Sequence, residues 1–328
     1  MTIRRVCCSE LILIIIYRKK HIIKMDRSSF FIKDKALFGS FPTQDAVEEL
    51  ETIGVRYFID LTHSHETKIV PYETRYTYIS FPIPDRRIPV NILEFSSFIV
   101  KLSDIILGLG EGEIIYVHCK GGHGRSGVVV ACLLSFLFNM EPSQALASTT
   151  IYHNNRKDMK EKWRKIGSPQ TYQQKKFVYL LCKPVIFFRA YKTGKTAGFS
   201  NFTCFPVHIE GFGTFPSSEA AIQAYKNPSD EEYVKKQENA RTPVISKRLG
   251  NKIFSEDWEN NKEKLMVNIL RCKFDQNPYI KEVLLNTYLS PIIYDIKRDN
   301  VWGIGMGDGQ NLLGKALYKI KTEYQRSM

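Results

Sequence analysis

The sequence predicts two consecutive domains: an α/β domain with a mostly parallel central sheet flanked by helices, followed by a mixed α+β domain. Between residues 26 and 183, short apolar runs alternate with longer segments whose apolar residues recur at helical spacing. This alternation is typical of a largely parallel sheet covered by helices. Residues 184–328 contain mostly helical segments, with glycines and aromatic residues concentrated at the loops. A length of 328 residues suits two domains of roughly 100–200 residues each.

The elements of the first domain follow from their end signals. A helix that begins at Asp45 ends at Gly54, because glycine readily adopts the left-handed conformation that closes a helix. A longer helix closes at Gly108 and Gly110, and one strand ends at the prolines of "FPIP". The expected strands lie over 36–42, 55–60, 77–84 and 113–118. The expected helices lie over 45–54, 90–110, 126–138, 142–153 and 169–182.

The second domain opens with an expected strand, "VIFFRAY" (185–191), just after the predicted boundary at Lys183–Pro184. Its last segment is a glycine-rich loop that leads into a C-terminal helix. Further helices are expected near 217–226, 230–240, 259–272 and 277–287.

Residues 1–25 are expected to form an N-terminal extension or disordered tail outside the folded domains. The uninterrupted apolar run, Leu11 to Tyr17, is much shorter than the about 20 residues that cross a bilayer. Glu10 stands where a signal peptide is apolar, and no small-residue cleavage site follows. We therefore expect no membrane partner for this chain.

The chain is basic, with 47 Lys and Arg against 34 Asp and Glu and a net charge of +13. This balance favours anionic partners such as phosphates, nucleotides, nucleic acid or a membrane surface. The interleaved aromatic and basic residues of a single-strand binder are missing, so nucleic acid is expected only as a modified substrate. Seven cysteines at spacings that do not suit a metal predict no metal site and a reducing, cytoplasmic environment.

The stretch "EIIYVHCKGGHGRSGVVVACLL" (113–134) places glycines between an apolar strand and an apolar helix. Glycines let backbone N–H groups converge, and such a nest at a helix N-terminus binds anions. Cys119 ends the strand, where the same positive field favours a thiolate, and Arg125 can bind two oxygens of one phosphate. Taken alone, Cys119 suits a buried apolar position and Arg125 a surface ion pair. Their joint occurrence in this loop favours an anion site with a nucleophile.

Here the chain resembles the cysteine-dependent protein tyrosine phosphatases, the dual-specificity branch in particular, over about residues 26–182. The signature His-Cys-x5-Arg-Ser is present as His118, Cys119, Arg125 and Ser126. The resemblance implies that Cys119 attacks phosphorus to form a phosphocysteine while Arg125 holds the phosphate oxygens. Ser126 would assist release of the thiolate, and His118 would orient the loop. The resemblance also implies phosphate binding by the loop residues Lys120, Gly121, Gly122, His123 and Gly124.

The leaving oxygen of a phosphate ester needs a proton, which this family supplies from an aspartate in a loop. Asp85, at a strand end in "FPIPDRRIP", is the expected general acid. Its alternative role is a turn residue paired with one of the two arginines that follow. Asp60 is a rival acid, but we expect it to cap the turn after its strand. Three later glutamines are treated as surface residues: Gln170, Gln173 and Gln174.

Lys120 and His123 are expected to add positive charge to the loop. This charge suits very acidic substrates such as phosphoinositides, polyphosphorylated ends or phosphonucleotides. Ordinary phosphoproteins fit as well, and an RNA 5′-phosphatase is an alternative function for this domain.

The segment "TFPSSEAAIQAYK" predicts a helix capped by Ser217 or Ser218. Glu219, Gln223 and Lys226 share one face of this helix. By spacing alone, such a face is more often a solvated polar stripe than a site.

Four separated motifs change this interpretation: "GFSNF", "FPSSEAAIQAYK", "DWENNKEKLMVNILRCKF" and "RDNVWGIGMGDGQNLLGKAL". Together they resemble the NADAR family, also called YbiA-like, over about residues 186–325. One departure is Ala220–Ala221, where many members carry a His and a larger residue. The resemblance implies an N-glycosidase that cleaves the ribosylamino bond of riboflavin-pathway intermediates or removes ADP-ribose from guanine. It implies Glu219 as the first catalytic candidate and five pocket residues: Asn201, Lys226, Trp258, Asp299 and Trp302.

These residue types suit cleavage of a C–N glycosidic bond. Positive charge develops on the sugar, and a carboxylate such as Glu219 stabilises it or activates water. Trp258 and Trp302 can stack on the base, although core packing is an alternative role for both. Lys226 is expected to bind a phosphate rather than attack the sugar as an amine. The glycines of "GIGMGDG" precede a helix start and offer a second phosphate cradle.

We therefore expect a bifunctional cytoplasmic hydrolase that needs no metal or organic cofactor. The first domain would dephosphorylate a phosphoprotein or a small molecule, and the second would cleave a phosphoribosyl or ADP-ribosyl substrate. An alternative of a different class makes the second domain a non-catalytic ADP-ribose or nucleotide reader that targets the phosphatase. A substrate with both a phosphate and a ribosyl–base bond would link the two halves.

Overall fold

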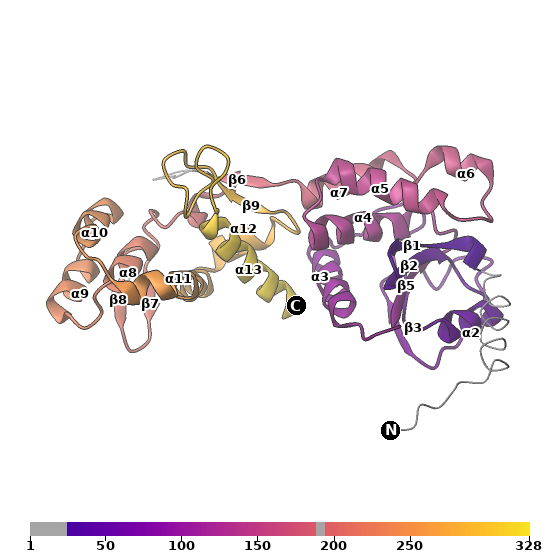
Figure 1. The fold of residues 1–328 in the computed structure, drawn as a ribbon, viewed down its shortest axis with the longest axis horizontal. Helices are drawn as coiled ribbons and strands as arrows, with labels where there is room; N and C mark the ends of the chain where they lie inside the picture. The colour runs from indigo at the N-terminus through magenta and orange to yellow at the C-terminus, as the bar shows by residue number, and fades with distance from the viewer. Residues whose placement is uncertain (1–24, 188–193) are drawn as a thin grey trace, which may run out of the picture. The chain divides into compact units, whose positions relative to one another are not determined.

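The computed structural model describes residues 25–187 and 194–328, and these form two compact units (Figure 1). The first unit ends at Cys182 and the second begins at Lys183. No helix in the described ranges is both long enough and apolar enough to cross a bilayer.

Two sequence predictions fall largely outside the described residues. The extension predicted over 1–25 is described only at Met25, where a short 3-10 helix begins. The strand predicted over 185–191 is described only as far as Phe187.

Within the described residues, the first unit is built on a five-stranded sheet of order β1-β2-β5-β3-β4, of which Figure 1 labels β1, β2, β5 and β3. β1 is antiparallel to β2, and the other neighbouring strands are parallel, so the predicted mostly parallel sheet is confirmed. Every residue of the central β5 is buried, which explains its unbroken apolar run. The strands are β1 (Ser28–Ile32), β2 (Ala36–Ser40), β3 (Val55–Asp60), β4 (Thr77–Ser80) and β5 (Ile114–Cys119).

Helices flank this sheet, which lies between α2 and α4 (Figure 1). α2 packs on the face that carries Leu37, Phe58 and Tyr116, because alternate strand residues point to opposite faces. The α4 helix packs against three other helices and is apolar nearly all round. The helices of this unit are α2 (Gln44–Thr52), α3 (Ile92–Gly108), α4 (Arg125–Phe138), α5 (Pro142–Asn154), α6 (Glu161–Ile166) and α7 (Tyr172–Cys182).

The second unit is mixed α+β, as predicted. Its strands form two short pairs: β6 (Val185–Phe187) parallel to β9 (Ile292–Tyr294), and β7 (Val207–Ile209) antiparallel to β8 (Gly213–Phe215). Its helices are α8 (Ser218–Ala224), α9 (Glu231–Glu238), α10 (Pro243–Gly250), α11 (Glu256–Gln276), α12 (Pro278–Leu285) and α13 (Leu312–Arg326). The long α11 contacts α8, α13 and β7 and so organises the core of the unit.

A buried lysine on α11 holds the loop that opens the second unit. Lys273 is fully buried, and its Nζ donates to the carbonyl oxygen of Ser200 at 2.8 Å and to Oγ1 of Thr203 at 3.4 Å. Burial lowers the pKa of this ammonium group to about 7. These bonds position the loop residue between them, Asn201, which lines the pocket described below.

Candidate active sites

The candidate phosphate loop joins the end of β5 to the start of α4. Cys119 ends the strand with 3% of its surface exposed, and its Sγ lies 3.5 Å from Oγ of Ser126. Gly122 has a φ of 70°, and a Cβ on it would lie 2.5 Å from the backbone of Gly39. The close turn of the loop therefore requires glycine at this position.

Arg156, which the sequence analysis missed, supports the loop from behind. Its guanidinium donates to the carbonyl oxygens of Gly122 at 2.8 Å and Phe38 at 3.1 Å, and 2% of the residue is exposed. In a trans peptide the C=O and the following N–H point in opposite directions, so the N–H of His123 points away from Arg156. Burial lowers the pKa of Arg156 to about 10, which leaves it charged at neutral pH. It therefore adds a fixed positive charge behind the loop.

His118 is fully buried and shares a 2.7 Å hydrogen bond with the hydroxyl of Tyr72 through Nε2. Burial lowers its pKa to about 4, although Asp60 nearby opposes the shift, so the ring is neutral near pH 7. The carboxylate of Asp60 accepts hydrogen bonds from the N–H and hydroxyl of Thr62 and from the hydroxyl of Tyr78. The expectation that Asp60 caps the turn after its strand is confirmed.

The guanidinium of Arg125 is held by two carboxylates. Asp85 Oδ1 accepts from Nη2 at 3.0 Å, and within the described residues Asp85 forms no ion pair with the two arginines that follow it. Both Nη atoms also donate to the carboxylate of Glu66, with Nη2 at 2.9 Å from Oε2. Burial raises the pKa of Glu66, but hydrogen bonds from Arg125 and the His63 N–H outweigh it and lower the pKa below its usual value. The sequence analysis missed Glu66.

The prediction of a surface position is wrong for Gln174. This side chain is fully buried, and its Nε2 donates to the carbonyl oxygen of Arg87 at 3.1 Å. It also lies 3.0 Å from where a Cβ on Gly124 would be. Gln174 thus contacts both the candidate loop and the segment that carries Asp85.

His123 does not add the positive charge that the sequence analysis expected of it. Its Nδ1 shares a 2.8 Å hydrogen bond with Nε2 of the buried His153. Its ring also stacks on Trp163, with centroids 4.7 Å apart. Burial, His153 and Arg156 together lower the pKa of His123 to about 3, so it is neutral at physiological pH. Of the two residues expected to add positive charge to the loop, only Lys120 can therefore do so.

The second unit contains a pocket of about 250 Å³ that brings together every residue predicted for its site. Those residues are Asn201, Glu219, Lys226, Trp258, Asp299 and Trp302. Gln223 also lines it from α8, which ends at Ala224, two residues before Lys226 and earlier than predicted. The polar residues of "SEAAIQAYK" thus line a pocket, and the solvated-stripe alternative is wrong. Three further polar residues, Lys247, Asn251 and Glu259, were missed.

Glu219 lies in the first turn of α8, which is capped by Ser217 through a 3.2 Å bond from the Ala220 N–H. The carboxylate is nearly buried, with 5% of the residue exposed, and its Oε1 accepts from Nε2 of Gln223 at 2.8 Å. The backbone N–H of Glu219 donates to the carbonyl of Asn201. These bonds hold the carboxylate at one wall of the pocket.

Two lysines supply the positive charge of the pocket. Lys226 donates to the carbonyl oxygen of Gly250 at 3.3 Å, and Lys247 comes from the neighbouring α10. Burial lowers the pKa of Lys226, and the charge of Lys247 lowers it further while Glu219 raises it. The pair is suited to a phosphate group.

Two tryptophans form the aromatic side of the pocket, with ring centroids 6.5 Å apart. Trp258 is part of the hydrophobic core and also lines the pocket. Trp302, which lines the pocket too, is partly buried against the same core. Asp299 Oδ1 accepts hydrogen bonds from the N–H groups of Val301 and Trp302. Asp299 therefore fixes the turn that presents Trp302.

The glycine-rich loop before α13 does not form the expected second phosphate cradle. The N–H groups of Asn311, Leu312 and Leu313 donate to carbonyl oxygens of residues 301–303. A Cβ on Gly309 would lie 2.5 Å from the carbonyl oxygen of Gly303. The glycines thus allow this loop to fold onto itself. The N–H groups at the start of α13 donate to carbonyl oxygens of the loop and are not left to bind a phosphate.

Comparison with known proteins divides the chain at the same place as its fold. Residues 26–178 match the family model described as "Swiss Army Knife protein, DSP-PTPase phosphatase domain". Residues 187–325 match the model of the NADAR domain.

Three curated proteins illustrate the similarity. The putative tyrosine phosphatase 197R of Invertebrate iridescent virus 6 is 50% identical over 121 residues, which is 36% of this chain and 46% of that protein. The putative tyrosine phosphatase 067L of Invertebrate iridescent virus 3 is 40% identical over 156 residues, which is 47% of this chain and 65% of that protein. The N-glycosidase YbiA of Escherichia coli is 33% identical over 138 residues, covering 40% of this chain and 85% of YbiA. The chain thus spans less than two thirds of the viral relatives and most of YbiA.

Proposed function

Because this chain joins a DSP-PTPase phosphatase domain to a NADAR domain, and through the latter belongs to the family of the N-glycosidase YbiA, we propose that it is a bifunctional hydrolase. Its first unit cleaves phosphomonoesters and its second unit cleaves an N-glycosidic bond. The observation that supports the first activity is the loop that runs from Cys119 to the buried Arg125. The observation that supports the second is the nearly buried Glu219 in a pocket walled by two tryptophans and two lysines.

In the proposed phosphatase reaction, the thiolate of Cys119 attacks phosphorus, an S–P bond forms and the P–O ester bond breaks. Asp85 donates its proton to the leaving oxygen. Water then attacks the phosphocysteine and gives up a proton to Asp85, and the S–P bond breaks to release phosphate. Ser126, at 3.5 Å from Sγ, stabilises the departing thiolate.

The contacts of Arg125 suggest how substrate binding and proton donation are coupled. Glu66 and backbone carbonyls occupy Nη1, while within the described residues Nε donates to no protein atom. A phosphate at the Nε–Nη2 edge therefore competes with Asp85 for Nη2. Substrate would thus release the Asp85 carboxyl group from Arg125 at the stage when a proton donor is needed.

The phosphatase is tested by phosphate release from p-nitrophenyl phosphate. We expect release from the native chain and none from Cys119→Ser. We also expect a phosphorylated protein species when the reaction is quenched during turnover. Phosphate release by Cys119→Ser at the native rate would refute the assignment of Cys119 as the nucleophile. Release from triphosphorylated RNA but not from a phosphotyrosine peptide would identify an RNA 5′-phosphatase instead.

In the proposed glycosidase reaction, the C1′–N bond of a riboside breaks, the hydroxyl of water joins C1′, and a proton passes to the departing nitrogen. Glu219 stabilises the positive charge that develops on the sugar or takes the proton from water. Trp258 and Trp302 hold the base, and Lys226 with Lys247 holds a phosphate of the substrate.

This reaction is tested first with the ribosylaminopyrimidine phosphate of riboflavin synthesis and then with ADP-ribosylated guanine. We expect release of the sugar phosphate or ADP-ribose by the native chain, and none by Glu219→Gln, which keeps the shape of the side chain. Binding of both compounds without cleavage would support the reader alternative. The phosphatase would be unaffected by that result.

A further inference from the structure

A hollow of about 220 Å³ adjoins the candidate phosphate loop in the first unit. It is lined by Lys120 and His123 of the loop and by Lys160 and Trp163 near α6. Arg27, just before β1, also lines the hollow. From this arrangement we infer that the hollow is a second phosphate subsite, and that the preferred substrates carry another phosphate beside the one that is cleaved. The inference rests on the proposed phosphatase function.

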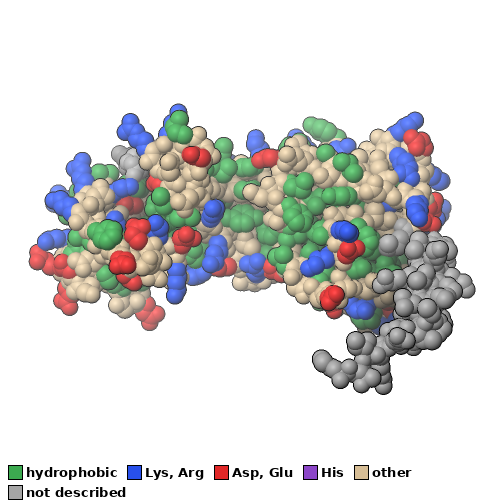
Figure 2. Space-filling model, in the orientation of Figure 1, with side chains coloured by type: hydrophobic (Ala, Val, Ile, Leu, Met, Phe, Trp, Pro, Cys, Tyr) green, Lys and Arg blue, Asp and Glu red, His purple; other side chains and the backbone are tan. Residues whose placement is uncertain are grey.

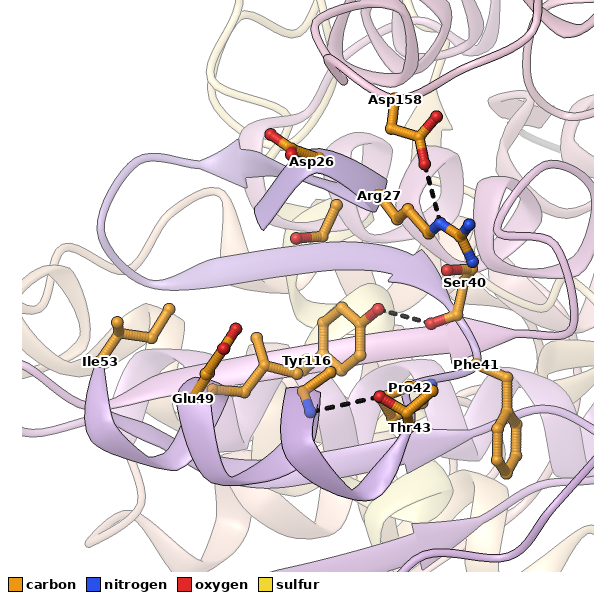
Figure 3. Close-up of a pocket in the computed structure, with 13 residues that line it drawn as sticks. Asp26, Arg27, Ser40, Phe41, Pro42, Thr43, Glu49, Ile53, Tyr116 and Asp158 are labelled. Atoms are coloured by element: carbon orange, nitrogen blue, oxygen red, sulfur yellow. Dashed lines mark hydrogen bonds and ion pairs between the residues drawn. The ribbon is translucent and has the colours of Figure 1, made fainter. Parts of the chain in front are cut away.

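The charges around the hollow favour an anion. Asp158 is the acidic residue in its lining, and Arg27 pairs with this carboxylate at 3.0 Å (Figure 3). Within residues 25–187 and 194–328, neither Lys120 nor Lys160 has a carboxylate oxygen within 4.0 Å. Neither lysine is therefore held in a close ion pair, although Glu66 attracts Lys120 at longer range, and Arg156 adds its buried charge behind the loop. A partly enclosed site strengthens their attraction for a phosphate relative to bulk water.

The aromatic wall gives the hollow a defined shape. The rings of His123 and Trp163 are nearly parallel, at 17°, and His123 is itself anchored to the buried His153. Since His123 is neutral, it shapes the subsite rather than supplying charge. A volume of about 220 Å³ is several times the roughly 30 Å³ occupied by one water, so a phosphate with part of its ester group fits.

A neighbouring hollow gives room for the rest of the substrate. It measures about 300 Å³ and shares Arg27, Ser40 and Asp158 with the first hollow (Figure 3). Ser40 is paired with Cys119 in the β2–β5 ladder, so both hollows lie close to the nucleophile. Ile53, on the α2 side, makes part of this larger hollow apolar. The organic part of a bisphosphate can therefore extend past the Arg27–Asp158 pair.

The experiment compares adenosine 3′,5′-bisphosphate with adenosine 5′-monophosphate and p-nitrophenyl phosphate. The variant is Lys160→Ala, and the matched control is Lys165→Ala, an exposed lysine of α6 outside the hollow. We expect the native kcat/KM to be about tenfold higher for the bisphosphate than for the monophosphate, as one added charge-assisted contact predicts. Lys160→Ala should remove most of that preference without changing p-nitrophenyl phosphate turnover. Lys165→Ala should change neither.

Equal kcat/KM values for the two nucleotides, or an equal effect of Lys160→Ala on all three substrates, would overturn the subsite and leave the phosphatase intact. If no compound is hydrolysed, the phosphatase proposal fails, and the subsite is decided by calorimetric titration of the native chain with the bisphosphate. Binding that Lys160→Ala weakens several-fold would support it, whereas equal or undetectable binding would overturn it. A preference for a phosphotyrosine peptide over the bisphosphate would also count against it.

Discussion

The carboxylate of Asp85 accepts a 3.0 Å hydrogen bond from Nη2 of Arg125, although 40 positions separate the two residues in the chain. Asp85 is half exposed, and Arg125 is 1% exposed. The expected proton donor is therefore held at the same guanidinium that is expected to bind the phosphate. This relationship supports the role of Asp85 and leads to the first prediction.

Asp85→Asn should lower kcat for phenyl phosphate by about 10²–10³-fold, because the amide cannot protonate the leaving oxygen. The loss should be much smaller with p-nitrophenyl phosphate, since nitrophenolate departs without a proton. Steady-state kinetics with the two substrates measures the difference. An equal loss with both would show that Asp85 acts on binding and not on the leaving group.

Glu66→Gln should weaken the binding of inorganic phosphate by about tenfold, because Arg125 loses a charged partner that holds its orientation. Inhibition of p-nitrophenyl phosphate hydrolysis measures this affinity. We expect KM to rise more than kcat falls, and Glu66→Asp to restore part of the affinity. Glu73→Gln, at an exposed glutamate of the same loop, serves as the control and should have no effect. Unchanged phosphate inhibition in Glu66→Gln would refute this positioning role.

The first unit should lose stability as the pH falls from about 6.5 toward 4. The pKa of both His118 and His153 is lowered by burial from 6.5 to about 4. Between these values the unfolded chain binds protons that the folded chain does not, so protonation favours unfolding. The free energy of unfolding therefore keeps its full value above pH 6.5. Below that pH the fully buried His118 lowers it by about 1 kcal/mol per pH unit.

Calorimetric unfolding of the native chain at pH 5, 6 and 7 tests this dependence. Tm of the first unit should fall toward acid, and His153→Gln should make the fall less steep because one titrating group is removed. A Tm that is constant from pH 5 to 7 would contradict the shifted histidines.

Lys247→Ala should raise KM for a phosphorylated riboside about tenfold, and should leave the dephosphorylated riboside nearly unaffected. Lys247 lines the pocket with Glu219, whereas the nearby exposed Lys252 does not, so Lys252→Ala is the matched control. Glycosidase assays with both ribosides supply the comparison. An equal change in KM for both ribosides would mean that Lys247 does not contact the phosphate.

Several short elements escaped the sequence analysis for a common reason. Periodicity needs more than one turn or several alternating positions to be visible, and these elements are too brief. α6 has six residues and none is buried, so it shows no apolar face. The missed elements are β1, α6, α10, β7, β8 and β9.

The residues that support the two sites were missed because their signals are not local. Glu66, Arg156 and Gln174 reach the phosphate loop or its neighbours from 59, 34 and 87 positions away. In the sequence, each is a polar residue in a loop or at the polar start of a helix. Such a residue is usually solvated, and only packing of the whole unit shows otherwise.

The sequence by itself determined those parts of the two sites whose residues lie close together along the chain. A strand, a glycine turn and a helix N-terminus bring Cys119 and Arg125 together locally, and helical spacing alone puts Glu219 and Gln223 on one face. The tertiary structure decided which charges complete these sites. Partners such as Glu66 come from separate loops and helices, and their burial and pKa depend on how those elements pack.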